Sequence, residues 1–166
     1  MSVRCTKNID NAPPTPVYCT GSATTIVDVT NPTTGKTWMD RNLGATQAAT
    51  SATDAASYGD IYQWGRFTDG HQCRTSASVT GTSAVTTVSG INTGKFLNGN
   101  ANWYTGSNPD ALWQGVDGTN NPCPSGYRIP TDTELQNERA SWSSNDLVSA
   151  FGSPLKLPAA GTRFGD

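Results

Sequence analysis

"NPCPSGYRIPTDTEL", Asn121 to Leu135, is the most specific stretch of this 166-residue chain. It holds Cys123 between Pro122 and Pro124. The two prolines restrict the backbone on both sides of the cysteine and lower the entropy lost when its sulfur is held in one place. The stretch therefore indicates a structural cysteine that precedes an abrupt change of backbone conformation.

The end of the same stretch predicts a helix that begins within two residues of Thr131. Thr131 followed by Glu134 is a capping box, in which each side chain bonds to the free backbone N–H of the other residue. A second short helix is predicted from Asp146 to Phe151, with Asn145 as its N-cap and Gly152 as its end.

Strand signals precede the helices. Thr24 to Thr30 and Lys36 to Asn42 flank the turn cluster Asn31 to Gly35, which predicts a β-hairpin. Tyr58 to Arg66 carries aromatic residues at alternate positions and is interpreted as a strand with one aromatic face. Thr75 to Gly90 is polar and β-branched, which fits an exposed hairpin or a long variable loop. Strands followed by helices, without alternation, predict an α+β fold with an antiparallel sheet.

Composition agrees with this fold class. Hydrophobic residues make up 34% of the chain and charged residues 14%, and glutamate occurs only at Glu134 and Glu138. Thr, Ser, Gly and Asn favour strands and turns over helices. Thr6 to Pro16 is proline-rich and predicts an extended linker, and Ala45 to Ser57 predicts a loop or a weak short helix.

Charge and hydropathy exclude two classes of partner. The net charge is -2 with no basic stripe, so a nucleic-acid partner is not expected. No long apolar run is present, so we expect no membrane span, and the first residues lack the apolar stretch of a signal peptide.

Four cysteines are scattered along the chain: Cys5, Cys19, Cys73 and Cys123. None belongs to a CxxC motif, so a zinc or redox motif has little support. An even count in a polar, charge-poor chain favours disulfides and an extracellular setting. The alternative is four reduced, buried thiols.

Four segments carry a family resemblance. They are "TNPTTGKTWMDRNLGA", "YGDIYQWGR", "LWQGVDGTNNPCPSGYRIPTDTEL" and "SPLKLPAAG", in this order. Together they resemble the Fibrobacter succinogenes major paralogous domain, found in secreted and surface proteins of Bacteroidetes-type bacteria, over about Val27 to Gly161. The resemblance implies a C-type-lectin-like fold: antiparallel strands, long loops and one or two short helices. "GYRIPTDTEL" is also similar to the helix entry of formylglycine-generating enzymes.

The N-terminal "SVRC", Ser2 to Cys5, resembles the closing motif of the same family. The resemblance therefore implies three parts. Residues 1–7 are the closing strand of a preceding or neighbouring copy, residues 8–22 a proline-rich linker, and residues 23–166 a C-terminally incomplete domain.

The resemblance also implies the disulfide pairing: Cys123 with an SVRC cysteine, and Cys19 with Cys73. Three arrangements remain open for Cys5. It bonds Cys123 of a neighbouring chain in a head-to-tail filament, which the semi-rigid linker favours. It bonds Cys123 of its own chain, as in a circular permutation. Or it is free.

Two groups of residues are candidates for binding. Trp103, Tyr104 and Trp113 make either a sugar- or protein-binding face or core plugs under long loops. His71 lies two residues from Cys73, but no further ligand pair is evident, so we expect a surface-loop histidine and no metal site.

Ca²⁺ is the one cofactor that the C-type-lectin-like resemblance raises. Five aspartates lie in one stretch: Asp28, Asp40, Asp54, Asp60 and Asp69. They form no DxDxDG-like loop, so turn and cap roles are favoured over Ca²⁺ ligation, and no cofactor is expected.

The resemblance implies a non-catalytic extracellular or cell-surface module for adhesion or fibre building. Its expected partners are other copies of itself, a glycan or a cell-surface protein. The alternative is a tail-fibre or receptor-binding protein in a phage virion. An oxidase of the formylglycine-generating type is a more distant alternative, because those enzymes use a cysteine pair in the C-terminal portion that this chain lacks.

Overall fold

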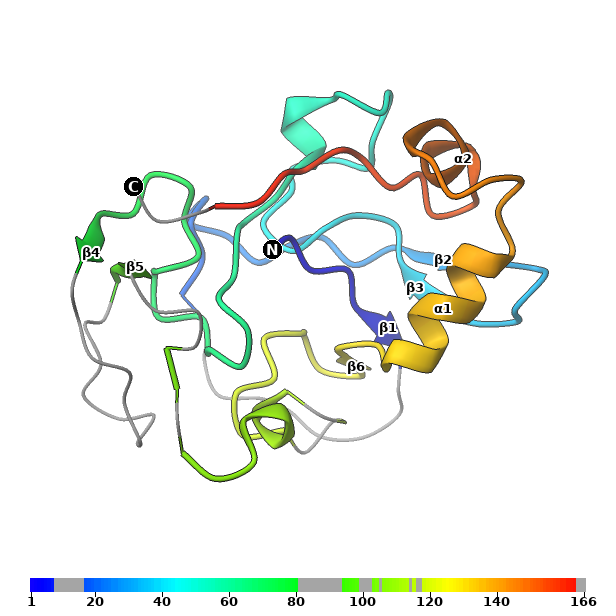
Figure 1. The fold of residues 1–166 in the computed structure, drawn as a ribbon. Coiled ribbons are helices and arrows are strands. Elements are labelled where there is room, and N and C mark those ends of the chain that lie inside the picture. The colour runs from blue at the N-terminus through cyan, green and yellow to red at the C-terminus, as the bar shows by residue number, and fades with distance from the viewer. Residues whose placement is uncertain are drawn as a thin grey trace.

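The computed structural model describes residues 1–7, 17–80, 94–98, 103–104, 106–113, 115 and 118–163. Within them, short strands and helices are joined by long irregular segments (Figure 1). The elements are β1 (Thr6–Lys7), β2 (Asp28–Thr30), β3 (Thr37–Met39), η1 (Ala55–Ser57), β4 (Ser78–Thr80), β5 (Phe96–Asn98), η2 (Pro109–Leu112), β6 (Tyr127–Arg128), α1 (Asp132–Ala140) and α2 (Leu147–Gly152). The predicted mixture of an antiparallel sheet with few short helices is confirmed.

The main sheet has four antiparallel strands in the order β2-β3-β1-β6. Thr6 of β1 lies opposite Trp38 on one side and Arg128 on the other. The strand predicted for residues 1–7 therefore pairs inside the sheet of its own chain. Residues 8–16, most of the predicted linker, lie outside the described residues.

The predicted hairpin is confirmed, with shorter strands than expected. β2 and β3 pair with Thr30 opposite Thr37 and Val29 opposite Trp38. The turn between them is closed by Asn31, whose side chain accepts the backbone N–H of Thr33 at 2.9 Å. Such a bond is the reason why asparagine favours turns.

A second, two-stranded sheet joins β4 to β5 in parallel, a pairing that the sequence did not indicate. It lies on the opposite side of the molecule from α1 and α2 (Figure 1). β4 falls at the start of the predicted Thr75–Gly90 hairpin or loop. The rest of that prediction, from residue 81 onward, lies outside the described residues.

The strand predicted from Tyr58 to Arg66 is wrong. This segment is irregular, and its backbone bonds to scattered partners: Ile61 N–H donates to Gln72 and Tyr62 N–H to Met1. Its alternate aromatics do not share one environment, since Tyr62 is 4% exposed and Trp64 is 44% exposed. The alternate spacing of these aromatic residues therefore arises from two separate environments and does not indicate one face of a strand.

The helix predicted after Pro130 is confirmed as α1. Thr131 accepts the N–H of Glu134, and Glu134 accepts the N–H of Thr131, which completes the capping box. Glu134 also binds both terminal nitrogens of Arg128 at 2.8 Å. This bond ties the helix start to β6, directly after a turn in which Gly126 has a φ of 83°.

The second helix is confirmed with a different cap. α2 has Asp146, not Asn145, as its N-cap, because the Asp146 carboxylate accepts the N–H of Ser149 at 2.7 Å. Ala45 to Ser57 forms a loop that ends in η1, capped by Asp54. Among the described residues, no helix is long and apolar enough to cross a membrane.

The core lies on one face of the N-terminal segment that leads into β1. Val3 and Cys5 point into a cluster whose other members are Met39, Leu43, Tyr62, Trp113, Cys123, Tyr127 and Ile129. Successive strand side chains point to opposite faces, so Arg4 and Thr6 face the other way. Because Thr6 lies opposite Trp38, Arg4 and Trp38 share that second face, and both line a hollow together with residues of α1.

Candidate functional site

Both predicted disulfides are present, and both lie within the chain. Cys5 bonds Cys123 with their Cα atoms 6.0 Å apart, and Cys19 bonds Cys73 with their Cα atoms 5.3 Å apart. The semi-rigid linker favoured a bond between Cys5 and Cys123 of a neighbouring chain. The bond instead forms within one chain, as in the circular-permutation alternative. A strand already paired on both sides holds Cys5 close to Cys123 of its own chain.

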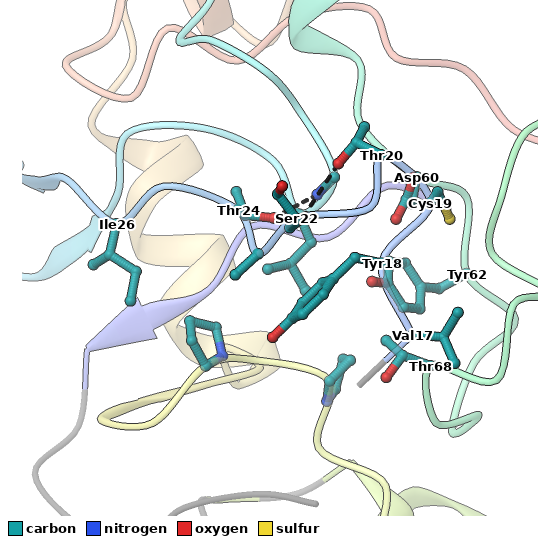
Figure 2. Close-up of a pocket in the computed structure, with 15 residues that line it drawn as sticks. Val17, Tyr18, Cys19, Thr20, Ser22, Thr24, Ile26, Asp60, Tyr62 and Thr68 are labelled. Carbon is teal, nitrogen blue, oxygen red and sulfur yellow. Dashed lines mark hydrogen bonds between the residues drawn. The ribbon is translucent and has the colours of Figure 1, made fainter. Parts of the chain in front are cut away.

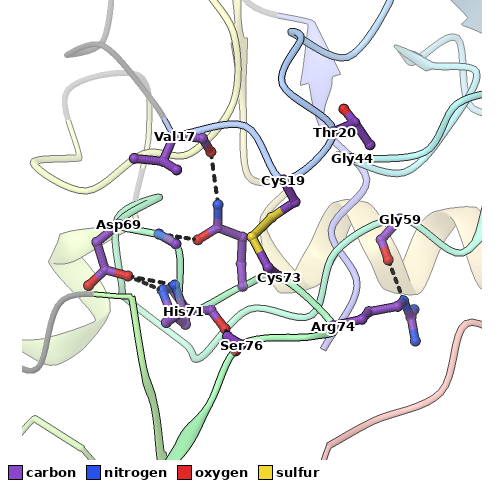
Figure 3. The surroundings of a disulfide bond; sticks show 12 residues. Val17, Cys19, Thr20, Gly44, Gly59, Asp69, His71, Cys73, Arg74 and Ser76 are labelled. Carbon is purple, nitrogen blue, oxygen red and sulfur yellow. Dashed lines mark hydrogen bonds and ion pairs between the residues drawn. A yellow bond between two sulfur atoms is a disulfide. The ribbon is translucent and has the colours of Figure 1, made fainter.

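The second disulfide fastens a segment that was assigned to the linker. Val17 donates its backbone N–H to Thr68, and Gln72 donates its side-chain amide to the Val17 carbonyl at 2.9 Å (Figure 3). Residues 17–22 are thus bonded to the body of the domain through Cys19 and its neighbours.

The predicted aromatic binding face is not formed as a surface. Trp113 is 1% exposed and belongs to the main core, where its ring packs against Tyr62. Trp103 is 6% exposed, and the Arg66 guanidinium lies over its ring. Tyr104 is half-buried beside it. Trp103 and Trp113 therefore match the core-plug interpretation.

His71 is a core histidine rather than the expected surface one. It is fully buried, and its Nε2 accepts the backbone N–H of Gln63 at 3.1 Å. The ring proton therefore sits on Nδ1 and is donated to Asp69 at 2.7 Å (Figure 3). Burial lowers the pKa of His71, although Asp69 opposes this effect. Both ring nitrogens are engaged, so the pair is structural.

Four of the five clustered aspartates have structural partners. Asp28 bonds Lys7 and Tyr127, and Asp40 bonds Arg41. Asp54 caps η1, and Asp69 bonds His71 and Arg66. The described residues hold no cluster of His, Cys, Asp and Glu side chains suited to a metal ion.

Asp60 is the exception. It is 7% exposed, and no described residue donates a hydrogen bond to its carboxylate. The carboxylate faces a cavity of about 70 Å³ that is also lined by Tyr18, Tyr62 and Thr68 (Figure 2). The Thr68 hydroxyl is buried without a partner. Burial raises the pKa of Asp60 to about 6, against the opposing charge of Arg74.

Two hollows adjoin each other along α1. One has a volume of about 450 Å³ and is lined by Trp38, Gln136, Trp142 and Leu155, among others. The next has a volume of about 400 Å³ and is lined by Met1, Ile129, Pro130 and Pro158, among others. Arg4, Asp132, Leu135 and Leu157 line both. We call the two hollows together the α1 groove.

Two residues that line the α1 groove carry a buried donor atom without a partner. The atoms are Nη2 of Arg4 and Nε1 of Trp38, on residues that are 7% and 0% exposed. Leu135 on the helix side is 44% exposed, so the groove also presents an apolar wall. A preformed hollow with apolar walls and a few polar groups is the usual form of a binding site.

Sequence reasoning missed Arg4 and Trp38, and it grouped Asp60 with the aspartates expected in turns and caps. A usable signal existed for Arg4, since it alternates with Val3 and Cys5 in a short β-branched and cysteine-bearing segment. Such alternation places a charge on the face opposite the core cysteine. No local sequence pattern distinguished Asp60 from the other aspartates. Its lack of a hydrogen-bond partner becomes visible only once the structure shows which partners the others have.

Comparison with known proteins places the chain in no group: no family model, no curated protein and no solved structure matches it.

Proposed function

We propose that the chain is a non-catalytic extracellular module that binds a surface partner in the α1 groove. The observation that carries the proposal is the groove itself, whose volume is formed by packed elements rather than by a loop alone. Its floor includes Arg4, which lies just before the doubly paired strand β1 and beside the disulfide-bonded Cys5, and Trp38 of β3. A floor held in this way loses little conformational entropy on binding, which favours recognition.

The extracellular setting is supported by the two disulfides. All four cysteines of the chain are bonded, and such bonds persist in oxidising compartments. The C-type-lectin-like assignment accords with an antiparallel sheet, short helices and long irregular segments, and belongs to the same proposal.

Adhesion has more support than the other roles. A head-to-tail fibre loses its expected covalent link, because Cys5 bonds within its own chain. An oxidase of the formylglycine-generating type has less support, because every cysteine is committed to a disulfide. A bacterial surface protein and a phage receptor-binding protein would use the same binding surface. Co-purification of the chain with virions would distinguish the two.

Flow cytometry with the fluorescently labelled chain tests the proposal. We expect binding to bacterial or host cells, or to a glycan array, that falls at least tenfold in the variant Leu135→Asp. Leu135 is exposed on α1, so the change alters the groove wall without opening the core. Val148→Asp is the matched control, because Val148 is 79% exposed on α2 and does not line the groove.

Two outcomes contradict the proposal. One is equal loss of binding in both variants. The other is turnover of a cysteine-containing peptide by the unmodified chain, which restores the oxidase interpretation.

A further inference from the structure

The α1 groove contains a buried cation whose bonds are all to neutral groups. Arg4 donates from Nε to the Asn42 side-chain oxygen at 3.1 Å. It donates from Nη1 to the carbonyls of Met39 at 2.8 Å and Leu155 at 3.1 Å. Nη2 has no partner. A buried charge that lacks a bonded counter-ion is costly, so this guanidinium favours an incoming anion.

The carboxylate whose charge acts on Arg4 already has other partners. Asp40 raises the pKa of Arg4, but both of its carboxylate oxygens bond to Arg41, at 2.7 and 2.9 Å. Burial prevails and lowers the pKa of Arg4 to about 10. The side chain therefore remains a cation at neutral pH without a carboxylate bonded to it.

Trp38 adds a second donor on the same side of the sheet. Thr6 and Trp38 are register partners, and Arg4 precedes Thr6 by two positions, so Arg4 and Trp38 emerge on one face. Both residues line the same hollow. Unpartnered N–H donors on two residues that line one hollow equal in number the two oxygens of a carboxylate, and a charge-assisted bond is stronger than a neutral one.

The remaining lining restricts the ligand further. Leu135, Leu157 and Ile129 give the groove aliphatic walls, which suit apolar side chains better than sugar hydroxyls. Asp132, Glu138 and Arg139 also line the groove, so its charges beyond Arg4 give no net attraction for a polyanion such as a phosphate ester. A single carboxylate beside apolar groups meets both conditions.

We propose that the α1 groove binds a polypeptide segment in which one carboxylate, flanked by apolar side chains, accepts hydrogen bonds from Arg4 Nη2 and Trp38 Nε1. The inference rests on the proposed binding function and names the chemistry of its partner. Because both donor atoms are nearly sealed from solvent, binding includes a small movement of the groove walls toward the carboxylate.

The test uses nuclear magnetic resonance of the ¹⁵N-labelled full chain. The Trp38 indole resonance is assigned with Trp38→Phe, and the probe is the peptide Ac-Leu-Asp-Leu-Leu-NH₂. We expect the Trp38 indole resonance to shift downfield as the probe is added. The control peptide Ac-Leu-Asn-Leu-Leu-NH₂, which lacks the charge, is expected to need at least a tenfold higher concentration for the same shift.

Variants locate the effect. Arg4→Lys keeps the positive charge but loses the planar fork, so we expect affinity for the aspartate peptide to fall about tenfold. Because Arg4 is buried and its substitution can disturb folding, Leu135→Asp provides a second variant at an exposed position, expected to repel the carboxylate. Val148→Asp is expected to bind like the unmodified chain.

Each remaining outcome overturns the inference. An unmoved Trp38 resonance means that water occupies the hollow. Equal shifts with both peptides mean that a neutral acceptor suffices. A shift with galacturonic acid but not with the aspartate peptide means a carbohydrate ligand. If cell binding still depends on Leu135 while the aspartate peptide fails, the proposed function stands without this inference; if neither depends on Leu135, both fail.

Discussion

The sulfur atoms of Cys5 and Cys123 are bonded across 118 positions of sequence, inside the hydrophobic core. Cys5 directly precedes β1, and Cys123 lies four residues before β6, so the bond fastens two neighbouring strands. β1 also pairs with β3 on its other side. The disulfide therefore fastens β6, an edge strand of the main sheet, to the inner strand β1.

Removing this disulfide should destabilise the whole sheet. For the double variant Cys5→Ser/Cys123→Ser we expect a loss of about 5 kcal/mol in the free energy of unfolding, from the entropy of a closed loop of this length. Urea unfolding followed by tryptophan fluorescence measures it. The same model predicts about 4 kcal/mol for Cys19→Ser/Cys73→Ser, whose loop spans 54 positions.

The location of the bond is checked separately by non-reducing gel electrophoresis of the unmodified chain. We expect a monomer with no thiol that reacts with an alkylating agent. A ladder that collapses on reduction and disappears in Cys5→Ser would instead restore the bond between neighbouring chains.

Asp60 should make stability depend on pH between about 4 and 6. Its pKa is about 6 in the folded chain, above the ordinary value of 3.8, so the folded state binds more protons in this range. Stability contributed by the protonated carboxyl is therefore lost as pH rises from 4 to 6. With allowance for screening by water, we expect a change of about 1–2 kcal/mol.

The variant Asp60→Asn isolates this effect, because it keeps the shape and removes the charge. We expect its free energy of unfolding at pH 7 to exceed that of the unmodified chain, with no fall between pH 4 and 6. Glu134 titrates at a lower pH, since the bond from Arg128 holds its pKa at about 2. An unchanged pH profile in Asp60→Asn would show that the Asp60 carboxylate is solvated in the folded chain.

The capping box of α1 predicts a local effect. Thr131→Ala removes the acceptor for the Glu134 N–H, so we expect a loss of about 1 kcal/mol in the free energy of unfolding. Thr133→Ala is the matched control in the first turn of the same helix, where alanine has the higher helix propensity and no cap is lost. In thermal unfolding, we expect the melting temperature to fall in Thr131→Ala and to rise in Thr133→Ala.

Local sequence signals predicted the elements whose bonds are local. The capping box of α1 and the β2–β3 hairpin depend on residues within a few positions of each other, and the structure contains both. The Tyr58–Arg66 strand failed because its backbone partners, such as Gln72 and Met1, are set by tertiary packing. The parallel pairing of β4 with β5 is equally non-local, and no periodicity reports it.

The candidate site was harder to predict than the fold. The aromatic residues Trp103 and Trp113 were natural candidates, but large rings serve the core as readily as a ligand, and here they are buried. The groove donors Arg4 and Trp38 become neighbours only when β1 enters the sheet beside β3. The family resemblance assigned residues 1–7 to another copy of the domain. It therefore gave no reason to expect Arg4 beside Trp38, which line the same groove.

Gly44 and Asp60 form a contact that no other residue at position 44 allows. Gly44 has a φ of 78°, and a Cβ atom built on it would lie 2.3 Å from the Asp60 carboxylate carbon. For Gly44→Ala we expect about 1–2 kcal/mol from the left-handed backbone and a further 1–3 kcal/mol from the displaced carboxylate. Gly35→Ala is the control, because Gly35 has a φ of 67° but open space around its Cα atom.

A double-mutant cycle tests whether the carboxylate causes the extra cost. In an Asp60→Ala background, Gly44→Ala should cost no more than Gly35→Ala does, since only the backbone strain remains. Denaturant unfolding of the four Gly44 and Asp60 variants gives the coupling free energy. A coupling near zero would mean that the Asp60 side chain moves aside at no cost, and that the cavity beside it accommodates the displaced carboxylate.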